Sequence, residues 1–139
     1  MRRQNAGMPD PASAPCPCGA AARYRDCCGR WHAGPLHLQS PDAVALMRSR
    51  YSAYVLGLTD YLLATWHPGT RPAELAPLEQ GLKWLGLEIR RHAASDADHA
   101  VVEFVARSKL GGRAHRMRET SRFVREAGRW FYLDGDVAA

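Results

Sequence analysis

Hydrophobic positions recur at helical spacing in the first half of the chain. Between residues 41 and 56 they return at steps of three and four, a period that predicts an amphipathic helix. The segment Ser40-Pro41-Asp42 is a typical helix start, with serine as N-cap, proline at the first position and aspartate in the first turn. Gly57 is suited to the left-handed turn that ends a helix. The apolar stripe consists of Val44, Met47, Tyr51, Tyr54, Val55 and Leu58.

Two shorter helices are predicted after this one. Thr59 is expected to cap the first of them, which ends at His67 because the residue before a proline avoids the helical conformation. Residues 72 to 80 are expected to form the second, which ends before Gly81.

The hydrophobic period changes to two in the second half, as expected for strands with one buried face. Four alternating runs cover residues 84–89, 100–106, 114–126 and 129–133, with turn residues at 96–98, 109–113 and 127–128. Strands joined by such short turns predict an antiparallel meander. Helices followed by strands predict an α+β domain, in which the helices pack on one face of a curved sheet.

All four cysteines lie within thirteen residues. Cys16 and Cys18 form a C-x-C pair, and after eight further residues Cys27 and Cys28 are adjacent. Two close pairs joined by a short loop can surround one tetrahedral ion, and four thiolates suit Zn²⁺. His32 is a spare candidate ligand. The alternatives to a metal site are four ordinary reduced cysteines or a redox pair.

Four protein ligands would leave no open coordination position on the metal. We therefore expect one structural zinc ion per chain rather than a catalytic one. The module has almost no apolar core of its own, so metal binding would supply much of its folding free energy.

Length and composition indicate how many domains the chain can form. The chain has 139 residues, 46% of them hydrophobic, which is enough for one ordinary domain and a small appendage. We divide it into a flexible tail (1–15), a cysteine module (16–35) and a helix-and-strand domain (40–135). No stretch approaches 18 apolar residues and the N-terminus has no apolar signal segment, so we expect a cytoplasmic protein without a membrane span.

The net charge is +5, and arginine supplies nearly all of the positive charge because Lys83 and Lys109 are the only lysines. This balance predicts a modest affinity for acidic partners. Nucleic-acid binding, through the cysteine module together with Arg116, Arg118 and Arg122, is the weakest alternative, because no basic run is interleaved with exposed aromatic residues.

The segment CPCGAAARYRDCCG resembles the SEC-C motif, a small zinc-binding module found at the C-terminus of the SecA translocation ATPase and in several uncharacterised bacterial proteins. The match covers all four cysteines together with Gly19, Tyr24 and Gly29. The SecA resemblance implies that the module docks on a partner protein.

A second resemblance covers roughly residues 41 to 135. The stretches MRSRYSAYVLGLTDYLLATWHP, KWLGLEI and ETSRFVREAGRWFYLDGD resemble the YchJ-like family of uncharacterised bacterial proteins. That resemblance implies an NTF2-like (cystatin-like) cone preceded by a SEC-C module. Many relatives carry a second SEC-C module after the sheet, whereas this sequence stops at Ala139, so a function that needs two such modules is not expected here.

NTF2-like cones have a cavity at the wide end, and six residues are candidates to line it. His115 and Glu119 share a strand face and can form a base and its orienting partner. Each has a structural alternative: a cross-strand pair for His115 with Glu119, an ion pair for Arg48 with Asp60, and a helix-end role for His67. Trp66, Trp84, Trp130 and Tyr132 are interpreted as core residues. The six candidates are Arg48, Tyr51, Asp60, His67, His115 and Glu119.

The leading hypothesis is therefore a non-enzymatic zinc-binding protein. Its cysteine module would dock on an acidic surface of a partner protein, while the cone binds a small ligand, forms a homodimer or acts as a scaffold. The first alternative is a small enzyme of the NTF2-like kind that uses acid–base residues in the cone. The sequence carries no cofactor fingerprint and no Gly-rich phosphate loop that would name a reaction.

Overall fold

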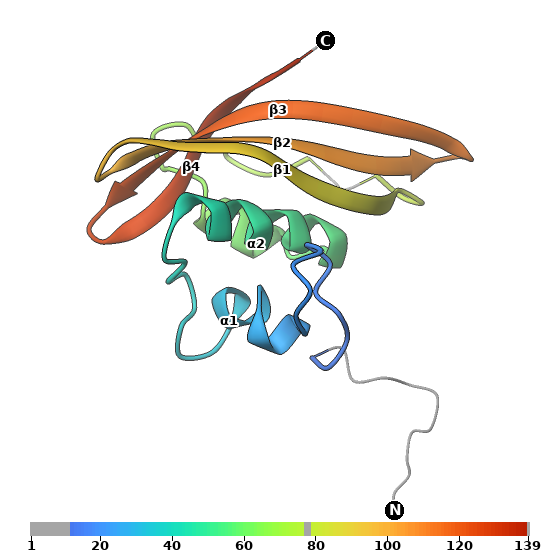
Figure 1. The fold of residues 1–139 in the computed structure, drawn as a ribbon, viewed down its shortest axis with the longest axis horizontal. Helices are drawn as coiled ribbons and strands as arrows, with labels where there is room; N and C mark the ends of the chain where they lie inside the picture. Colours follow the sequence, from blue (N-terminus) through green and yellow to red (C-terminus); the bar gives the residue numbers. More distant parts are fainter. Residues whose placement is uncertain (1–11, 77–78, 139) are drawn as a thin grey trace, which may run out of the picture.

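The computed structural model describes residues 12–76 and 79–138. A four-stranded sheet forms one layer, helix α2 lies against one face of the sheet, and the small cysteine module lies on the other side of α2 (Figure 1). The helices are η1 (Tyr24–Asp26), α1 (Gly29–His32), α2 (Ala43–Leu56) and α3 (Thr59–Ala64). The strands are β1 (Lys83–Asp96), β2 (His99–Leu110), β3 (Arg113–Glu126) and β4 (Arg129–Val137).

Helix α2 begins two residues later than the pattern predicts. Its N-cap is Asp42 rather than Ser40, because the Asp42 carboxylate accepts a hydrogen bond from the N–H of Ala45 at 2.7 Å. The end is as predicted. Gly57 adopts a φ of 74°, and its N–H donates to the carbonyl of Ala53.

Helix α3 is shorter than predicted. Its N-cap is Leu58, whereas Thr59 is the first helical residue, and the helix ends at Ala64 rather than at His67. Beyond the helix the chain joins the edge of the sheet: Trp66 forms a bridge with Tyr132, and the N–H of His67 donates to the Tyr132 carbonyl at 2.8 Å. Pairing with β4 therefore replaces the last helical turn.

The helix predicted for residues 72–80 is wrong in the part of this segment that the structure describes. Residues 72–76 and 79–80 have no helical conformation, and residues 77–78 lie outside the described residues. The segment contains Pro72 and Pro77, and a proline disfavours the helical conformation of the residue before it.

The sheet confirms the predicted meander. Its order is β1-β2-β3-β4 with antiparallel neighbours, and its hairpins turn at residues 97–98, 111–112 and 127–128. Gly111 and Gly112 have φ values of 58° and 79°, the left-handed backbone that a two-residue hairpin turn requires. Strand β1 extends past its predicted end, where residues 90–96 are all exposed and so show no hydrophobic alternation.

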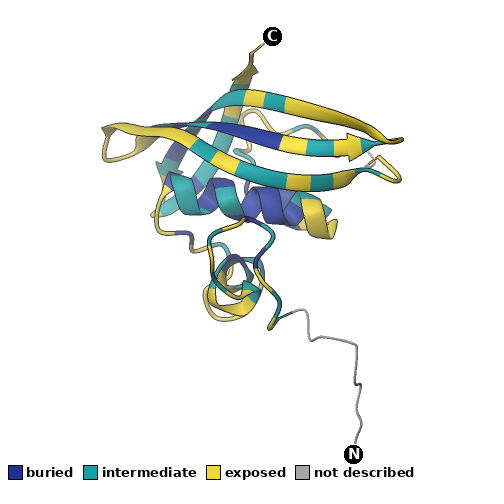
Figure 2. Cartoon of the chain, turned by 45° about the vertical axis from the view of Figure 1, so that its right-hand side comes forward, coloured by how far each residue is buried: buried dark blue, intermediate teal, exposed yellow. Residues whose placement is uncertain are grey.

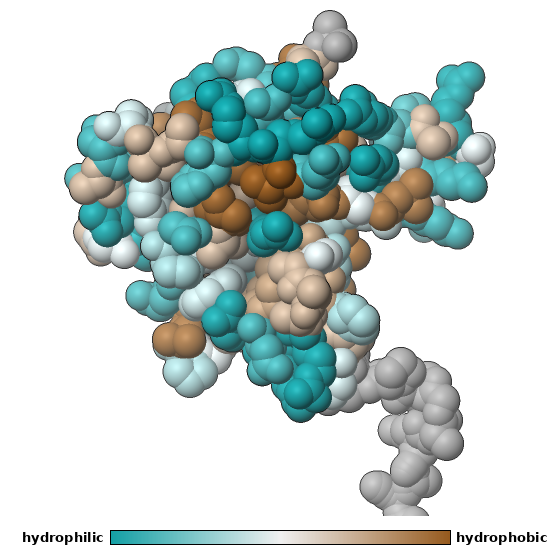
Figure 3. All heavy atoms as spheres, in the orientation of Figure 1, coloured by the Kyte–Doolittle hydropathy of each residue, from teal (hydrophilic) through white to brown (hydrophobic). Residues whose placement is uncertain are grey.

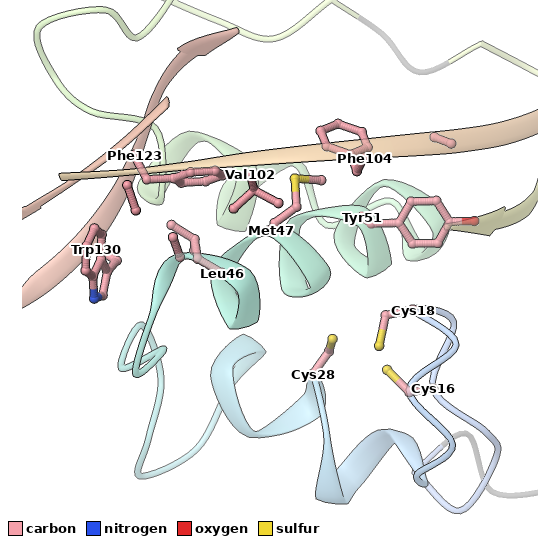
Figure 4. Close-up of a cluster of buried hydrophobic side chains, with 13 residues drawn as sticks. Cys16, Cys18, Cys28, Leu46, Met47, Tyr51, Val102, Phe104, Phe123 and Trp130 are labelled. Atoms are coloured by element: carbon pink, nitrogen blue, oxygen red, sulfur yellow. The ribbon is translucent and has the colours of Figure 1, made fainter. Parts of the chain in front are cut away.

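The hydrophobic core lies between α2 and the sheet. Leu46 and Met47 of α2 point toward Val102, Phe104 and Phe123 of the sheet (Figure 4). Buried positions gather on α2 and on the middle of the sheet, whereas the ends of the hairpins are exposed (Figure 2). The predicted α+β class, with helices on one face of an antiparallel sheet, is confirmed.

The other face of the sheet is covered by ion pairs. Arg118 contacts Glu103 at 2.6 Å, and Arg122 contacts Asp134 at 2.6 Å and Asp136 at 2.8 Å. Hydrophilic residues dominate the top of the view in Figure 3, whereas hydrophobic residues gather in the middle of that view. None of the helices in the described ranges combines the length and the apolar character needed to cross a bilayer.

Candidate metal centre and ligand cavity

A tight loop presents the first cysteine pair. The N–H of Cys16 donates to the carbonyl of Ala22 at 2.8 Å, and Pro15 forms a bridge with Arg23. Gly19 lies within this loop and has a φ of 81°, a conformation that residues with a Cβ rarely adopt. The loop thereby folds back immediately after Cys16 and Cys18.

The second cysteine pair lies between η1 and α1. The N–H of Cys27 donates to the carbonyl of Tyr24 at 3.0 Å, and Cys28 precedes the first residue of α1. That first residue is Gly29, where a Cβ would lie 2.7 Å from the same Tyr24 carbonyl oxygen. The close approach of the two backbone segments therefore requires glycine beside the cysteine pair.

The chain is tied to the module before the predicted boundary. The N–H of Tyr24 donates to the carbonyl of Ala14 at 2.8 Å, and the N–H of Arg25 donates to the carbonyl of Ala12 at 3.0 Å. Composition places residues 12–15 in the tail, but in the structure they pair with the module. Residues 1–11 of the predicted tail lie outside the described residues.

The structure brings the four cysteines together. Their Sγ atoms all lie within 4.8 Å of one another, and the Sγ atoms of Cys18 and Cys27 are 3.6 Å apart. Tetrahedral coordination with metal–sulfur bonds of about 2.3 Å places the sulfurs about 3.8 Å apart. Figure 4 shows the sulfurs of Cys16, Cys18 and Cys28 directed toward one another. The cluster therefore fits a single tetrahedral ion.

Mutual hydrogen bonds and burial shift the pKa values of three of the clustered thiols in different directions. Hydrogen bonds with Cys18 and Cys28 hold the pKa of Cys16 far below its usual range. Burial raises the pKa of Cys27 to about 11, and the hydrogen bond with Cys16 raises the pKa of Cys28. A bound dication would offset the repulsion between neighbouring thiolates, so metal binding would release protons from the cluster.

The cysteine module packs against α2. Arg48 donates from Nη1 to the carbonyl of Cys18 at 3.0 Å, and the Sγ of Cys16 lies 3.6 Å from the Oγ of Ser52. Cys16, Cys18 and Cys28 are buried in the same hydrophobic cluster as Leu46 and Met47. The cysteine cluster is therefore part of the main core.

His32 connects the module to α2 and is not one of the clustered ligands. Its Nε2 lies 2.8 Å from the carbonyl oxygen of Ser49, and its Nδ1 lies 2.5 Å from the hydroxyl of Tyr24. The neutral tautomer with hydrogen on Nε2 satisfies both contacts. Burial lowers the pKa of His32, which favours this neutral form.

We predict that His32→Phe destabilises the protein by about 1–3 kcal/mol, because Phe removes both hydrogen bonds while keeping a ring of similar size. Chemical denaturation followed by circular dichroism measures the change. His37→Phe is the matched control, because His37 is exposed, and its expected effect is within about 0.5 kcal/mol. Equal effects of the two substitutions would contradict the role assigned to His32.

A cavity of about 290 Å³ lies between α2 and the sheet. Aromatic rings and methionines form most of its wall, and the polar side chains in the wall include one arginine, one glutamate and one serine. Its lining residues are Met47, Arg50, Tyr51, Tyr54, Trp66, Trp84, Phe104, Met117, Glu119, Ser121 and Tyr132.

Two of the six predicted cavity residues, Tyr51 and Glu119, line it. Arg48 does not, because the side chain points to the cysteine module. Asp60 borders a separate hollow that contains His32 and forms no ion pair with Arg48. The predicted ion pair between Arg48 and Asp60 is therefore wrong. Arg48 lies on the side of α2 that faces the cysteine module, where it donates to the carbonyl of Cys18.

The two predicted histidines also lie outside the cavity wall. The Nε2 of His67 contacts the Oε2 of Glu126 at 2.9 Å at the protein surface. His115 shares a face of β3 with Glu119 as predicted, but it is exposed near the start of the strand, opposite Ser108. Strand β3 extends past the wall of the cavity. The alternation of side chains along a strand shows which face His115 is on, but not whether that part of the face borders the cavity.

The candidates predicted from the sequence do not include the arginine of the cavity wall, Arg50. Of the four residues predicted to be core, Trp130 is buried in the main core, and Trp84 and Tyr132 pack against it. Trp84 and Tyr132 also line the cavity, as does Trp66. The signal for Arg50 was present in the sequence. Arg50 follows Met47 by three residues and precedes Tyr54 by four, so it interrupts the apolar face of α2.

Glu119 is held in one position by its neighbours. Its Oε2 accepts hydrogen bonds from the hydroxyl of Ser121 at 2.6 Å and from the hydroxyl of Tyr132 at 3.3 Å. A Cβ on Gly135 would lie 2.3 Å from the same oxygen, so the carboxylate occupies space that a glycine leaves free. We expect Gly135→Ala to displace this carboxylate, which a shift of the Glu119 side-chain NMR signals would report.

Comparison with known families identifies two matching regions. The family described as YchJ, middle NTF2-like domain, matches residues 42–135, and the SEC-C motif matches residues 13–30. Together these regions include the cysteine cluster, helix α2 and the sheet.

Curated relatives and solved structures cover nearly the whole chain. A UPF0225 protein of Bordetella parapertussis is 60% identical over 132 residues, which are 94% of this chain and 99% of the relative. A UPF0225 protein of Methylibium petroleiphilum is 62% identical over 126 residues, covering 91% and 90% of the two chains. The solution structure of a SEC-C motif containing protein from Rhodopseudomonas palustris has a TM-score of 0.74 at 33% identity, covering 89% of this chain and 98% of that one.

Proposed function

The chain belongs to the YchJ family of UPF0225 proteins, and we propose that it is a non-enzymatic binding protein stabilised by one zinc ion. The NTF2-like domain binds a small ligand in its cavity, and the cysteine module docks on a partner protein. The observation that carries this proposal is the position of α2, which holds a four-cysteine cluster on one side and lines a cavity on the other.

Four thiolates are a soft ligand set that suits zinc in tetrahedral geometry. When bound, zinc would supply folding free energy to the module through Cys16, Cys18, Cys27 and Cys28. All four coordination positions would be filled by protein, so the ion would have no site for a substrate. The role of the ion is therefore structural.

The geometry favours binding over acid–base catalysis in the cavity. The pairs considered from the sequence, His115 with Glu119 and Arg48 with Asp60, are not assembled there, since only Glu119 lines the wall. The Oε2 of that carboxylate already accepts hydrogen bonds from Ser121 and Tyr132. A binding role agrees with a wall made mostly of aromatic and apolar side chains.

Exposed arginines on the module favour an acidic protein surface as its partner. Arg23, Arg25 and Arg30 are all exposed. Arg23 contacts Asp26 at 3.6 Å, whereas Arg25 forms no ion pair among the described residues. The guanidinium of Arg30 lies 4.4 Å from the ring centre of Trp31, which holds the charge at the surface of the module.

The sheet offers less support for nucleic-acid binding. Arg118 and Arg122, which belong to the face considered for that role, contact Glu103, Asp134 and Asp136. Phosphate contacts would have to replace these ion pairs.

We predict about one zinc ion per chain in protein purified without added metal, measured by elemental analysis. Acidification from about pH 8 to about pH 6 should weaken zinc binding, because protons compete with the metal for the thiolates. Titration with a zinc indicator at several pH values measures this change. Freshly purified, reduced protein without any metal would contradict the zinc proposal.

The partner role is tested by reversing the charge of the module in the full-length protein. Arg25→Glu combined with Arg30→Glu should abolish retention of a partner that the wild-type protein retains. Arg90→Glu combined with Arg113→Glu is the matched control, because both residues are exposed on the sheet, outside the module. Loss of the partner with both double variants would show a general charge effect.

A further inference from the structure

The cavity contains a buried positive charge that no carboxylate of the described residues contacts directly. Arg50 of α2 is only 4% exposed, and Nη1 donates to the carbonyl of Leu62 and to the Oγ1 of Thr65, each at 2.7 Å. These bonds tie α2 to the end of α3. No carboxylate among the described residues lies within 4.0 Å of the guanidinium. Burying a charge is costly unless it is paired.

Aromatic rings compensate only part of this cost. The guanidinium carbon of Arg50 lies 4.5 Å from the ring centre of Tyr132 and 5.3 Å from that of Trp66. The Nε and Nη2 groups of Arg50 have no hydrogen-bond partner among the residues described. The buried Nε1 of Trp66 likewise has no hydrogen-bond partner within residues 12–76 and 79–138. The same side of the cavity thus holds several unpaired donors.

The carboxylate of Glu119 limits the negative charge that a ligand in the cavity can carry. Glu119 lines the same cavity and carries its own negative charge near the site. Any ligand in this cavity meets one cation and one carboxylate, and Glu119 repels a monoanion less strongly than a dianion such as a phosphate monoester. The remaining wall includes Tyr51 and Trp84, whose ring centres are 5.5 Å apart.

We propose that the cavity binds a small apolar carboxylate, whose carboxylate accepts hydrogen bonds from Arg50 and whose hydrocarbon part packs among Tyr51, Trp66 and Trp84. This inference rests on the proposed ligand-binding function and adds the chemical class of the ligand. A guanidinium offers two parallel N–H groups that match the two oxygens of a carboxylate. The volume of about 290 Å³ is at the low end for ligand pockets and requires a small molecule.

The test uses full-length, metal-loaded protein and four probes: benzoate and phenylacetate, with their neutral amides benzamide and phenylacetamide. Binding is followed by isothermal titration calorimetry and by the NMR signals of the indole N–H groups of Trp66 and Trp84. We expect the carboxylates to bind at least about tenfold more tightly than the amides, and to shift these indole signals more than that of Trp130.

Arg50→Gln should weaken benzoate binding at least about tenfold and remove the preference for carboxylates. Arg129→Gln is the matched control. Arg129 also donates to the end of α3, from Nη2 to the carbonyl of Ala64 at 2.8 Å, but it does not line the cavity. If Arg50→Gln does not fold, Met117→Trp replaces it, because a larger side chain in the wall fills the cavity and leaves the charge in place.

Each outcome is decisive. Carboxylate-selective binding that Arg50→Gln or Met117→Trp removes, and that Arg129→Gln retains, supports the inference. Equal binding of carboxylates and amides overturns the carboxylate preference but leaves a ligand-binding cavity. Absence of binding by all four probes overturns this inference and removes support from the ligand-binding part of the proposed function. The zinc part of the proposal is tested separately by elemental analysis and does not depend on either result.

Discussion

Replacing Cys28 by serine is expected to abolish stoichiometric zinc binding and to unfold the cysteine module. Cys28 is 1% exposed, and its side chain belongs both to the sulfur cluster and to the core around α2. Serine removes one of four ligands and leaves a buried hydroxyl in place of a thiolate. Elemental analysis measures the metal, and hydrogen exchange of residues 12–35 measures the loss of structure.

The matched control for this substitution is Ser52→Ala. Ser52 is also fully buried and its hydroxyl lies 3.6 Å from the Sγ of Cys16, but it is not one of the clustered ligands. It should retain about one zinc ion per chain. A Cys28→Ser protein that keeps its metal and the hydrogen-exchange protection of the module would show that the four cysteines do not act as one ligand set.

The second large effect is expected at the centre of the main core. Leu46→Ala should reduce the free energy of unfolding by about 2.7–5 kcal/mol, because it removes buried methyl groups and leaves a cavity that the neighbours fill only in part. Leu46 is 1% exposed and packs in the cluster that contains Val102 and Phe123. Equilibrium unfolding in urea measures the change.

Leu56→Ala provides a control on the same helix with the same chemical change. Leu56 is 45% exposed at the end of α2, so its substitution is expected to change the free energy of unfolding by no more than about 0.5 kcal/mol. Comparable losses at both positions would contradict the central role of Leu46 in the core, because alanine has the higher helix propensity and the loss of an exposed leucine should cost little.

The order of the elements was predictable because local periodicity encodes it. The three- and four-residue steps before Gly57 and the alternation in β2 and β3 place the helix and the strands correctly. Apart from the helix predicted for residues 72–80, which is wrong in the described part of that segment, the errors are at element ends. Asp42 displaces Ser40 as the N-cap, and pairing of Trp66 with Tyr132 ends α3 early. Such choices depend on contacts between distant segments, which the local pattern does not contain.

The cavity residues show the same limit more clearly. Parity correctly placed Glu119 on the inner face of β3, but it could not show that His115 lies beyond the cavity. Helical spacing allowed both Arg48 and Arg50 near the buried stripe. Only the position of the module on one side of α2 and of the sheet on the other decides which arginine enters the cavity.

The sequence by itself determined the candidate metal ligands, the α+β class and the meander, because residue spacing and hydrophobic period are local properties of the chain. The tertiary structure alone decided that the cysteine module packs on α2, that Arg50 is buried in the cavity and that Trp66 and Trp84 form its wall. These features depend on how whole elements pack together. The cysteine module and the sheet are far apart in the sequence, and they pack on opposite sides of α2. Which side each one covers is a property of the whole fold and not of the local sequence.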